Sequence, residues 1–324
     1  MISSTLSRLA IAALAAGASA TALPAHSAWP DKPIRLVVPS SPGGSADAIA
    51  RLVGDRLSRA MGQPVLIDNK GGGGGNIATE AVVRSPADGY TLLLTGNNHP
   101  LNVSLFAKPP YKLDDFASVI ELTRGPSIFV AAPNAPFSTL RELIDKSKAS
   151  PGSIAYGSPG IGLPSHIAFE MFQRTADVTL AHAPYKGSGP SLADAMGGQI
   201  PVVSATLGAA LPHVKAGKLK ALAVTSEKRW PTLPDVPTVT EVIGKPFVHL
   251  TWLGILAPKG TPAPILAQLN AELNKVISDP AVKTAIDGMG TTAVGGTALA
   301  FQKVIDDEAV ASKALVQSAK LRAD

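Results

Sequence analysis

Short apolar runs alternate with helical patterns along almost the whole chain, and this alternation limits the fold more than any other feature. Most apolar runs are followed by a loop of small residues and then by apolar residues at helical spacing. The predicted strands are Ile34–Val38, Val65–Asp68, Thr91–Leu94, Val119–Leu122, Ile128–Ala132, Ile154–Tyr156, Leu180–His182, Ile200–Val203, Leu219–Val224 and Leu253–Leu256. The predicted helices are Ala46–Ala60, Ile77–Arg84, Leu140–Lys148, Ser165–Arg174, Ser191–Met196, Pro264–Ser278, Ala281–Gly288 and Leu299–Ser318. This order predicts an α/β protein with parallel sheets and helices on both faces.

Two stretches interrupt the alternation: Arg124–Pro126, and Trp230–Phe247, which is rich in Pro and Thr. If the chain crosses between domains at both places, each domain is an open α/β sheet. A ligand bound beyond the strand C-termini would then lie in the cleft between the domains. We therefore expect a discontinuous first domain, residues 28–126 with 252–324, and a second domain, residues 127–251.

Residues 1–27 predict a secretory signal peptide. Arg8 precedes the apolar, Ala-rich run Leu9–Leu23, and Ala25-His26-Ser27 places small residues where a signal peptidase reads the chain. The expected cut lies before Ala28, and a cut one or two residues away or after Ala22 fits equally well. No later stretch is long and apolar enough to span a bilayer, so we expect an exported, soluble protein.

Composition argues against several classes of function. The chain contains no cysteine, which excludes thiol catalysis and a Cys-ligated metal. Its net charge is +5, but the basic residues are scattered and form no stripe, so nucleic-acid binding is not expected. No two of its six histidines are spaced i,i+4 and H-E-x-x-H is absent, so no metal site is supported.

Three local features suggest chemistry that their surroundings do not support. Ser165 stands beside His166, but no G-x-S-x-G occurs, and adjacent residues on a helix point in different directions. In the tract Gly71–Gly75, Asn76 stands where G-x-G-x-x-G needs glycine, so a flexible turn is favoured over phosphate binding. For Lys186, a solvated surface lysine is favoured over a ligand contact.

The loops that follow the predicted strands are small, hydroxyl-bearing and Gly-rich. They are Ser40–Ser45, Lys70–Asn76, Thr95–Asn98, Gly157–Ser165, Lys186–Pro190 and Ser204–Gly208. Such loops gather at one edge of a parallel sheet and offer many N–H and O–H donors, which suits a small anion. In the first loop Ser45 is expected to cap the next helix, and Asp47 suits its dipole. By itself this loop fits an ordinary turn as well as an anion cradle.

Many short motifs occur here in the same order as in a known family. Taken together they resemble the periplasmic solute receptors of tripartite tricarboxylate transporters, the Bug-type receptors, over the whole mature chain. The matching segments are Pro33–Pro39 (P-I-R-x-V-V-P), Gly43–Asp47 (G-G-x-x-D), Ala50-Arg51, Asn69–Ile77 (N-x-x-G-A-G-G-x-I, with Gly73 for Ala), Pro86–Leu93 (P-D-G-Y-T-L-L, with Ala87 extra), Tyr156–Gly160 (Y-G-S-x-G), Ser165-His166, His182–Gly187 (H-V-P-Y-K-G), Gly198–Ile200 (G-Q-V), Ala221–Ser226 (A-L-A-V-T-S), Arg229, Leu233–Thr238 (L-P-D-V-P-T) and Pro258–Pro262 (P-x-G-T-P). The ordered set is far more specific than any single motif.

The resemblance implies a two-lobed fold of the periplasmic binding protein type II kind, two open sheets joined by a hinge, which closes on a small organic acid. It implies a monomeric periplasmic receptor without enzymatic activity or cofactor, which delivers its ligand to membrane permease subunits. One carboxylate would dock on the first domain. The implicated residues are Ser40, Ser41, Gly43, Gly44, Ser45 and Thr95 in the first domain, and Ser158, Gly160, Gly162, Ser165 and His166 in the second. Asp47 is expected to organise the first loop rather than touch an anion.

Three places depart from the family pattern, and they bear on the ligand. Ser204 and Ala205 stand where many members carry Phe-Asp, which disfavours an amino-acid ligand. Asn97 belongs to T-G-N-N where G-T-S-G is usual, and Leu163 and Pro164 replace small polar residues. We therefore expect Asn97, Ser204 and Ala205 at the site, and a ligand acid with an apolar or aromatic body.

Three functions remain to be weighed. A transport receptor and an orphan binding protein that serves a periplasmic sensor fit the sequence equally well. An exported hydrolase is disfavoured, because no nucleophile, base and acid can be assembled from the motifs.

Overall fold

The sheet is mixed and is organised around one long strand. The computed structural model describes residues 29–319 and residue 322, so the expected signal peptide lies outside the described residues. By its internal contacts the chain divides into Met1–Asp31 and Lys32–Asp324, and all elements below belong to the second unit. Within the described residues, ten strands form one sheet in the order β2-β1-β3-β9-β4-β7-β5-β6, and β8 and β10 also pair with β4.

The elements alternate much as the apolar pattern predicts. The strands are β1 (Ile34–Val38), β2 (Val65–Asn69), β3 (Thr91–Gly96), β4 (Phe116–Ala131), β5 (Ala155–Ser158), β6 (Ala181–Pro184), β7 (Val202–Thr206), β8 (Lys220–Val224), β9 (Leu250–Pro258) and β10 (Thr292–Ala293). The helices are α2 (Ser45–Met61), α3 (Asn76–Val83), α4 (Asn98–Leu105), α5 (Leu140–Ala149), α6 (Pro164–Ala176), α7 (Ser188–Met196), α8 (Leu207–Lys215), α9 (Val239–Ile243), α10 (Ala263–Ser278), α11 (Pro280–Gly288) and α12 (Ala298–Ala319).

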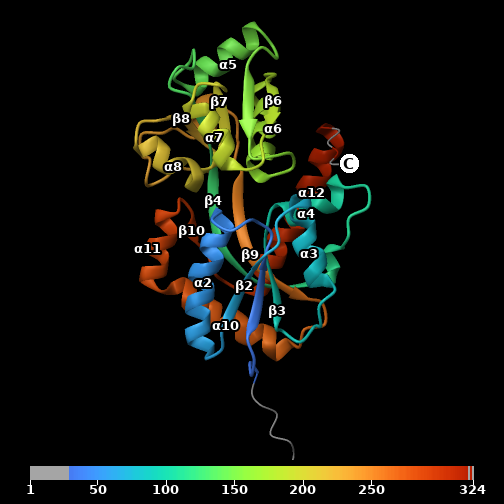
Figure 1. Cartoon of the computed structure of the whole chain (residues 1–324). Helices are drawn as coiled ribbons and strands as arrows, with labels where there is room; N and C mark the ends of the chain where they lie inside the picture. Colours follow the sequence, from blue (N-terminus) through green and yellow to red (C-terminus); the bar gives the residue numbers. More distant parts are fainter. Residues whose placement is uncertain (1–28, 320–321, 323–324) are drawn as a thin grey trace, which may run out of the picture. The chain divides into compact units, whose positions relative to one another are not determined.

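Strand β4 belongs to two half-sheets (Figure 1). Its residues Phe116–Pro126 pair with β9, whereas from Ser127 onward it pairs with β7 and β8. We call β1, β2, β3, β9 and β10, with the first part of β4, the first half-sheet. The second half-sheet comprises β5 to β8 with the rest of β4. Where the domain boundaries lie stays a prediction.

The expected parallel pairing is only partly correct. β1 pairs in parallel with β2 and β3, and β5 pairs in parallel with β6 and β7. β9 and β4, however, run antiparallel to their neighbours. The predicted interruption of the strand at Arg124–Pro126 was also wrong, because β4 is continuous over its 16 residues from Phe116 to Ala131. Proline is tolerated there because the strand changes hydrogen-bonding partner at this point.

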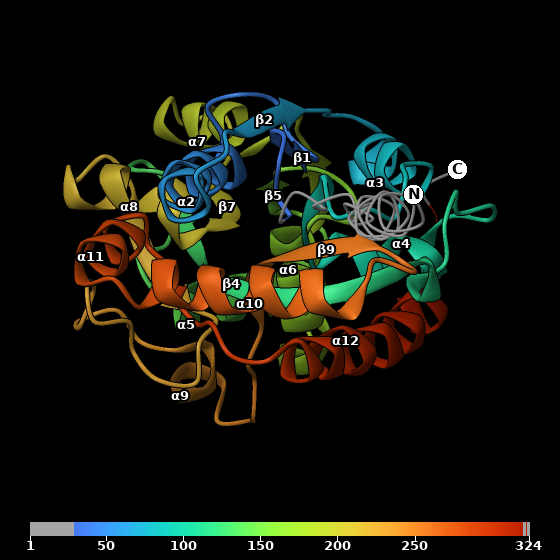
Figure 2. The same ribbon diagram turned by 90° about the horizontal axis from the view of Figure 1, so that it is seen from below.

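Helices cover both faces of each half-sheet, as predicted. In the first half-sheet α2, α10 and α11 lie on one side and α3, α4 and α12 on the other, as Figures 1 and 2 show. In the second half-sheet, side chains of α5, α6 and α9 form one apolar core and those of α7 and α8 form another. Among the described helices, none has the length and apolar character that crossing a membrane requires.

Helix α2 shows how the sequence sets a helix and where the expectation failed. Ile49, Val53 and Leu57 recur every four residues and are buried together. Gly62, with φ 69°, ends the helix in the left-handed conformation. The predicted cap was wrong: Gly44 holds the N-cap position without a side-chain hydrogen bond, and Ser45 is the first helical residue.

Helices α4, α8 and α9 were not predicted. Pro100 lies in the first turn of α4 and Pro212 lies inside α8, and a proline at such positions argues against a helix. α9 is only five residues long and begins with a capping box formed by Thr238 and Glu241.

Candidate functional site

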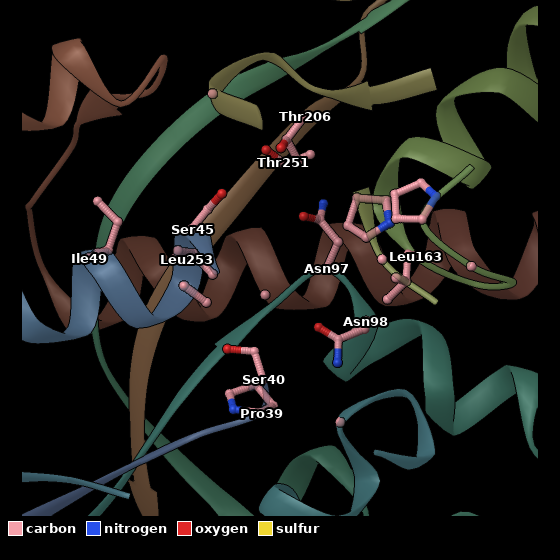
Figure 3. A pocket seen from close by; sticks show the side chains of 18 of the residues that line it. Pro39, Ser40, Ser45, Ile49, Asn97, Asn98, Leu163, Thr206, Thr251 and Leu253 are labelled. Atoms are coloured by element: carbon pink, nitrogen blue, oxygen red, sulfur yellow. The ribbon is translucent and has the colours of Figure 1, made fainter. Parts of the chain in front are cut away.

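A cavity of about 700 Å³ lies at the edge of the sheet where the parallel strands end, and Figure 3 shows part of its wall. Both half-sheets contribute to it. The lining residues are Pro39, Ser40, Ser41, Ser45, Ala46, Ile49, Gly71, Gly72, Gly74, Gly75, Gly96, Asn97, Asn98, Thr123, Pro126, Pro159, Gly160, Ile161, Leu163, Pro164, Lys186, Gly187, Thr206, Leu207, Gly208, Thr251, Trp252, Leu253, Met289, Gly290 and Thr291.

Six helices begin at this wall, because each follows a strand whose C-terminal end reaches the cavity. They are α2, α3, α4, α6, α7 and α8. Their first turns carry backbone N–H groups without intrahelical partners and the positive end of the helix dipole. None of the six has a side-chain hydrogen bond at its N-cap. A small anion would satisfy groups that these helices leave open.

Most helices that begin away from the cavity have a side-chain cap at the N-terminus. The Thr139 side chain caps α5, Thr238 caps α9 and Asp279 caps α11. Helix α10 starts behind Pro262, also without a side-chain cap. The Thr297 hydroxyl caps α12 by accepting from the Ala300 amide at 3.1 Å. Side-chain caps are thus present on four helices outside the cavity and absent from all six at its wall.

The wall carries almost no charge. None of its lining residues is acidic, and Lys186 is its one charged side chain among the residues that the structure describes. Glu308 hydrogen-bonds Asn97 from α12, outside the lining, and burial raises the pKa of its carboxyl. Its lining therefore presents the positive ends of helix dipoles and one lysine, which favours an anion over a cation.

Asp47 holds the loop Ser40–Ser45 in place without itself lining the cavity. Its Oδ2 accepts from the Gly43 amide at 2.9 Å and from Arg51 Nε at 3.0 Å, and its Oδ1 accepts from Asn69 Nδ2 at 3.0 Å. The Arg51 and Gly43 hydrogen bonds lower the pKa of Asp47 to about 2. The Ser40 hydroxyl oxygen, by contrast, is buried and has no hydrogen-bond partner among the described residues.

The glycine tract is part of the wall rather than a loose turn. Asn98 and Asn102 donate to the Gly74 carbonyl at 2.7 and 2.9 Å, which fixes the tract against α4. A side chain at Gly75 would collide with the Asn98 amide, and φ there is +96°. The preference for a flexible turn therefore missed four lining residues, whose repeated glycines allow this close approach.

Asn97 lines the cavity while holding β9 in place. Its Nδ2 donates to the Leu250 carbonyl at 3.1 Å, and its Oδ1 accepts from the Trp252 amide at 3.0 Å. Both polar ends of this amide are therefore engaged in the wall itself. Figure 3 shows Asn97 between Ser45 and Leu163, which come from different half-sheets.

In the second half-sheet, two histidines support the loop 158–163. His182 Nε2 lies 2.7 Å from the Ser158 hydroxyl, and the Gly162 amide donates to His166 Nδ1 at 3.2 Å. The two rings stack with centroids 4.2 Å apart. Burial lowers the pKa of both histidines to about 4, so both rings are neutral near pH 7. Both histidines lie outside the lining and hold the loop that forms this part of the wall.

The structure brings some of the predicted site residues together and separates others. Ser40, Ser41, Ser45, Asn97 and Gly160 line the cavity. The predicted residues outside the lining are Gly43, Gly44, Thr95, Ser158, Gly162, Ser165, His166, Ser204 and Ala205.

These outlying positions have individual explanations. Ser165 and Ser204 are buried and bonded to one another, since the Ser204 hydroxyl donates to the Ser165 carbonyl at 2.6 Å. Thr95 is buried within β3, and the Ala205 methyl lies in an apolar core. Gly162 lines a smaller cavity of about 300 Å³ beside the first.

Six of the lining residues that the sequence did not single out come from distant segments. Thr251–Leu253 arrive on β9, and Met289–Thr291 follow α11. No local motif marks these segments, because only the closure of the sheet brings them to the site. Most of the other lining residues beyond the predicted set, Lys186 among them, stand in the donor-rich loops that the sequence did single out.

Known proteins are similar to this chain in sequence and in fold. The model of the tripartite tricarboxylate transporter family receptor matches residues 49–321. Protein BugT of Bordetella pertussis is 38% identical over 303 residues, which cover 93% of this chain and 91% of that protein.

Two similar solved structures contain a ligand. R. palustris Rpa4515 with adipate is 31% identical, with TM-score 0.85 and coverage of 91% of this chain and 99% of the other. MatC from Rhodopseudomonas palustris with bound malate is 29% identical, with TM-score 0.81 and coverage of 89% and 100%.

Proposed function

Because the chain belongs to the tripartite tricarboxylate transporter receptor family, a family of solute-binding receptors and not of enzymes, we propose that it binds a small organic acid in the cavity. The protein works in the periplasm as a monomer and delivers the acid to the membrane permease subunits of such a transporter. The resemblance noted in the sequence is thereby confirmed at the level of the family.

One observation carries the proposal: six uncapped helix N-termini meet at a wall without acidic side chains. Backbone N–H groups at helix starts bind carboxylates well, and their partial charges act together in a confined cavity. The adipate and malate bound by two similar proteins are anions of this class.

The apolar part of the lining supports an acid with an apolar or aromatic body. Ile161, Leu163 and Pro164 contribute apolar surface from the second half-sheet, and Trp252 and Leu253 contribute it from β9. Burying a ligand's hydrocarbon against these side chains adds affinity that a purely polar cavity would lack.

Closure of two domains, residues 28–126 with 252–324 and residues 127–251, would couple binding to recognition by the permease. A ligand that contacts both half-sheets favours the closed state by its higher affinity for that state. Ser40 and Ser45 would hold the common carboxylate, while Leu163 and Pro164 would select the rest of the molecule.

A thermal-shift screen of the mature protein against mono-, di- and tricarboxylates, followed by calorimetry of the hits, tests the proposal. We expect at least one acid to raise the melting temperature in a concentration-dependent manner, because it binds only the folded state. Acids with an apolar or aromatic body should outrank citrate. Failure of every acid to bind at millimolar concentration would refute the receptor function, and tight citrate binding without binding of aromatic acids would refute the apolar body.

A further inference from the structure

Lys186 lies where its positive charge can interact with a charged group of a bound ligand. It belongs to the segment between β6 and α7, and its neighbour Gly187 is the N-cap of α7. Both residues line the cavity from the side of the second half-sheet. Every other lining residue that the structure describes is neutral, so Lys186 is the wall's single full charge.

The ammonium group has no partner within the protein. Among the described residues, no hydrogen bond or ion pair reaches Lys186 Nζ, although carboxylates pair with Arg51, Arg124 and Lys275 elsewhere. Asp47, the acid that holds the first loop, is bonded to Arg51 behind that loop. A charge without a counter-ion beside an apolar cavity is well suited to meet a ligand anion.

The backbone that carries Lys186 is fixed. The Tyr185 amide donates to the Ser158 carbonyl at 3.0 Å, and the Gly187 amide donates to the Pro159 carbonyl at 2.8 Å. The Tyr185 hydroxyl also donates to Asp194 Oδ2 at 2.8 Å. The exposed lysine side chain therefore extends from a rigid base beside the cavity, so little backbone entropy is lost when it engages a ligand.

We propose that Lys186 is the residue that selects doubly charged ligands, a proposal that rests on the receptor function above. One anionic group binds the neutral donors of the first loop and the start of α2, and the second group pairs with Lys186. Neutral hydrogen-bond donors bind a carboxylate equally well whether or not the rest of the ligand carries a second charge. Lys186, which belongs to the second half-sheet, distinguishes ligands that carry a second negative charge from ligands that do not.

Matched probes separate the second charge from everything else. The probes are adipate against monomethyl adipate, and succinate against monomethyl succinate, which keep the chain length and remove one charge. Wild-type protein should prefer the tighter of the two diacids over its monoester by about threefold or more. Because Lys186 is exposed, K186Q should weaken binding of that diacid by about 3- to 5-fold and leave binding of its monoester unchanged. K186R should keep most of the preference.

Lys218→Gln is the control, because Lys218 is exposed, lies in the same half of the chain and does not line the cavity. It should leave both affinities unchanged. Equal weakening of diacid and monoester in K186Q, or a wild-type protein that binds the monoesters as well as the diacids, would overturn the role of Lys186. Failure of the wild type to bind any acid of the screen would instead refute the receptor function.

Discussion

At the scale of single residues, Asp47 acts from outside the cavity. Its carboxylate accepts hydrogen bonds from Gly43, Arg51 and Asn69, and its pKa falls to about 2. The acid therefore stays ionised and paired while it shapes the loop that carries Ser40. An anion in the cavity meets donors from this loop and not the negative charge that positions them.

Three buried histidines, His99, His166 and His249, and the half-buried His182 make folding stability depend on pH. Burial lowers the pKa of His99 to about 3 and of His166, His182 and His249 to about 4, although Glu170 lies 3.9 Å from His166 Nε2. The unfolded chain binds these protons near pH 6.5, so unfolding takes up protons between pH 6.5 and 4. Stability should be complete above pH 7 and should fall as the pH drops through this window.

Urea unfolding at half-unit steps from pH 7.5 to 4 measures this loss directly. The variant H166Q keeps a neutral acceptor for the Gly162 amide and should show a shallower slope than the wild type. Stability that stays constant or rises between pH 6.5 and 4 would contradict neutral buried histidines.

At the scale of elements, a negative charge at the start of a helix has opposite effects on folding stability and on anion binding. In α2 an acidic residue at the first helical position suits the dipole and should stabilise the protein by about 0.3–1 kcal/mol. The same charge would face the anion site. We expect Ser45→Asp to raise the urea midpoint slightly and to weaken acid binding by at least about 100-fold.

Ser45→Asn serves as its control, because it is polar and uncharged. It should reduce binding by no more than about tenfold, as expected for a neutral hydrogen bond. If calorimetry shows unchanged affinity for Ser45→Asp, the start of α2 does not hold the ligand anion.

Elements also show what the sequence could and could not predict. Helix α2 and strand β1 were predicted closely, because their apolar periods are clear and a glycine-rich loop separates them. β4 was split in two, since Pro126 normally ends a strand and the change of partner that tolerates it is a tertiary feature. The motifs located the loops of the site, but not which of their residues face inward: Ser40 does, whereas Ser165 is buried behind the wall.

At the scale of the whole molecule, the two half-sheets meet closely beside the cavity. Gly208, in the first turn of α8, packs against the segment Met289-Gly290 that follows α11. A methyl group at Gly208 would collide with the Met289 carbonyl oxygen. This contact links an element of the second half-sheet to one of the first, so its geometry limits how far they can approach.

Gly208→Ala should therefore act as a wedge. We expect this contact to belong to the closed state, in which overpacking costs about 1–3 kcal/mol and so weakens acid binding by about 5- to 150-fold. Small-angle scattering should show less compaction on addition of ligand than in the wild type. Gly288→Ala is the control, because a methyl group there meets no atom within 4 Å. Equal affinity of Gly208→Ala and wild type would show that closure does not depend on this contact.

A crystal structure of the mature protein with the tightest acid of the screen shows whether a carboxylate binds where the uncapped helices converge. We expect a carboxylate within hydrogen-bond distance of the Ser40 hydroxyl and the first turn of α2, with the rest of the acid against Leu163 and Trp252. An acid bound outside this cavity, or inside it with its carboxylate away from these helix starts, would show that the uncapped helices do not form the anion site.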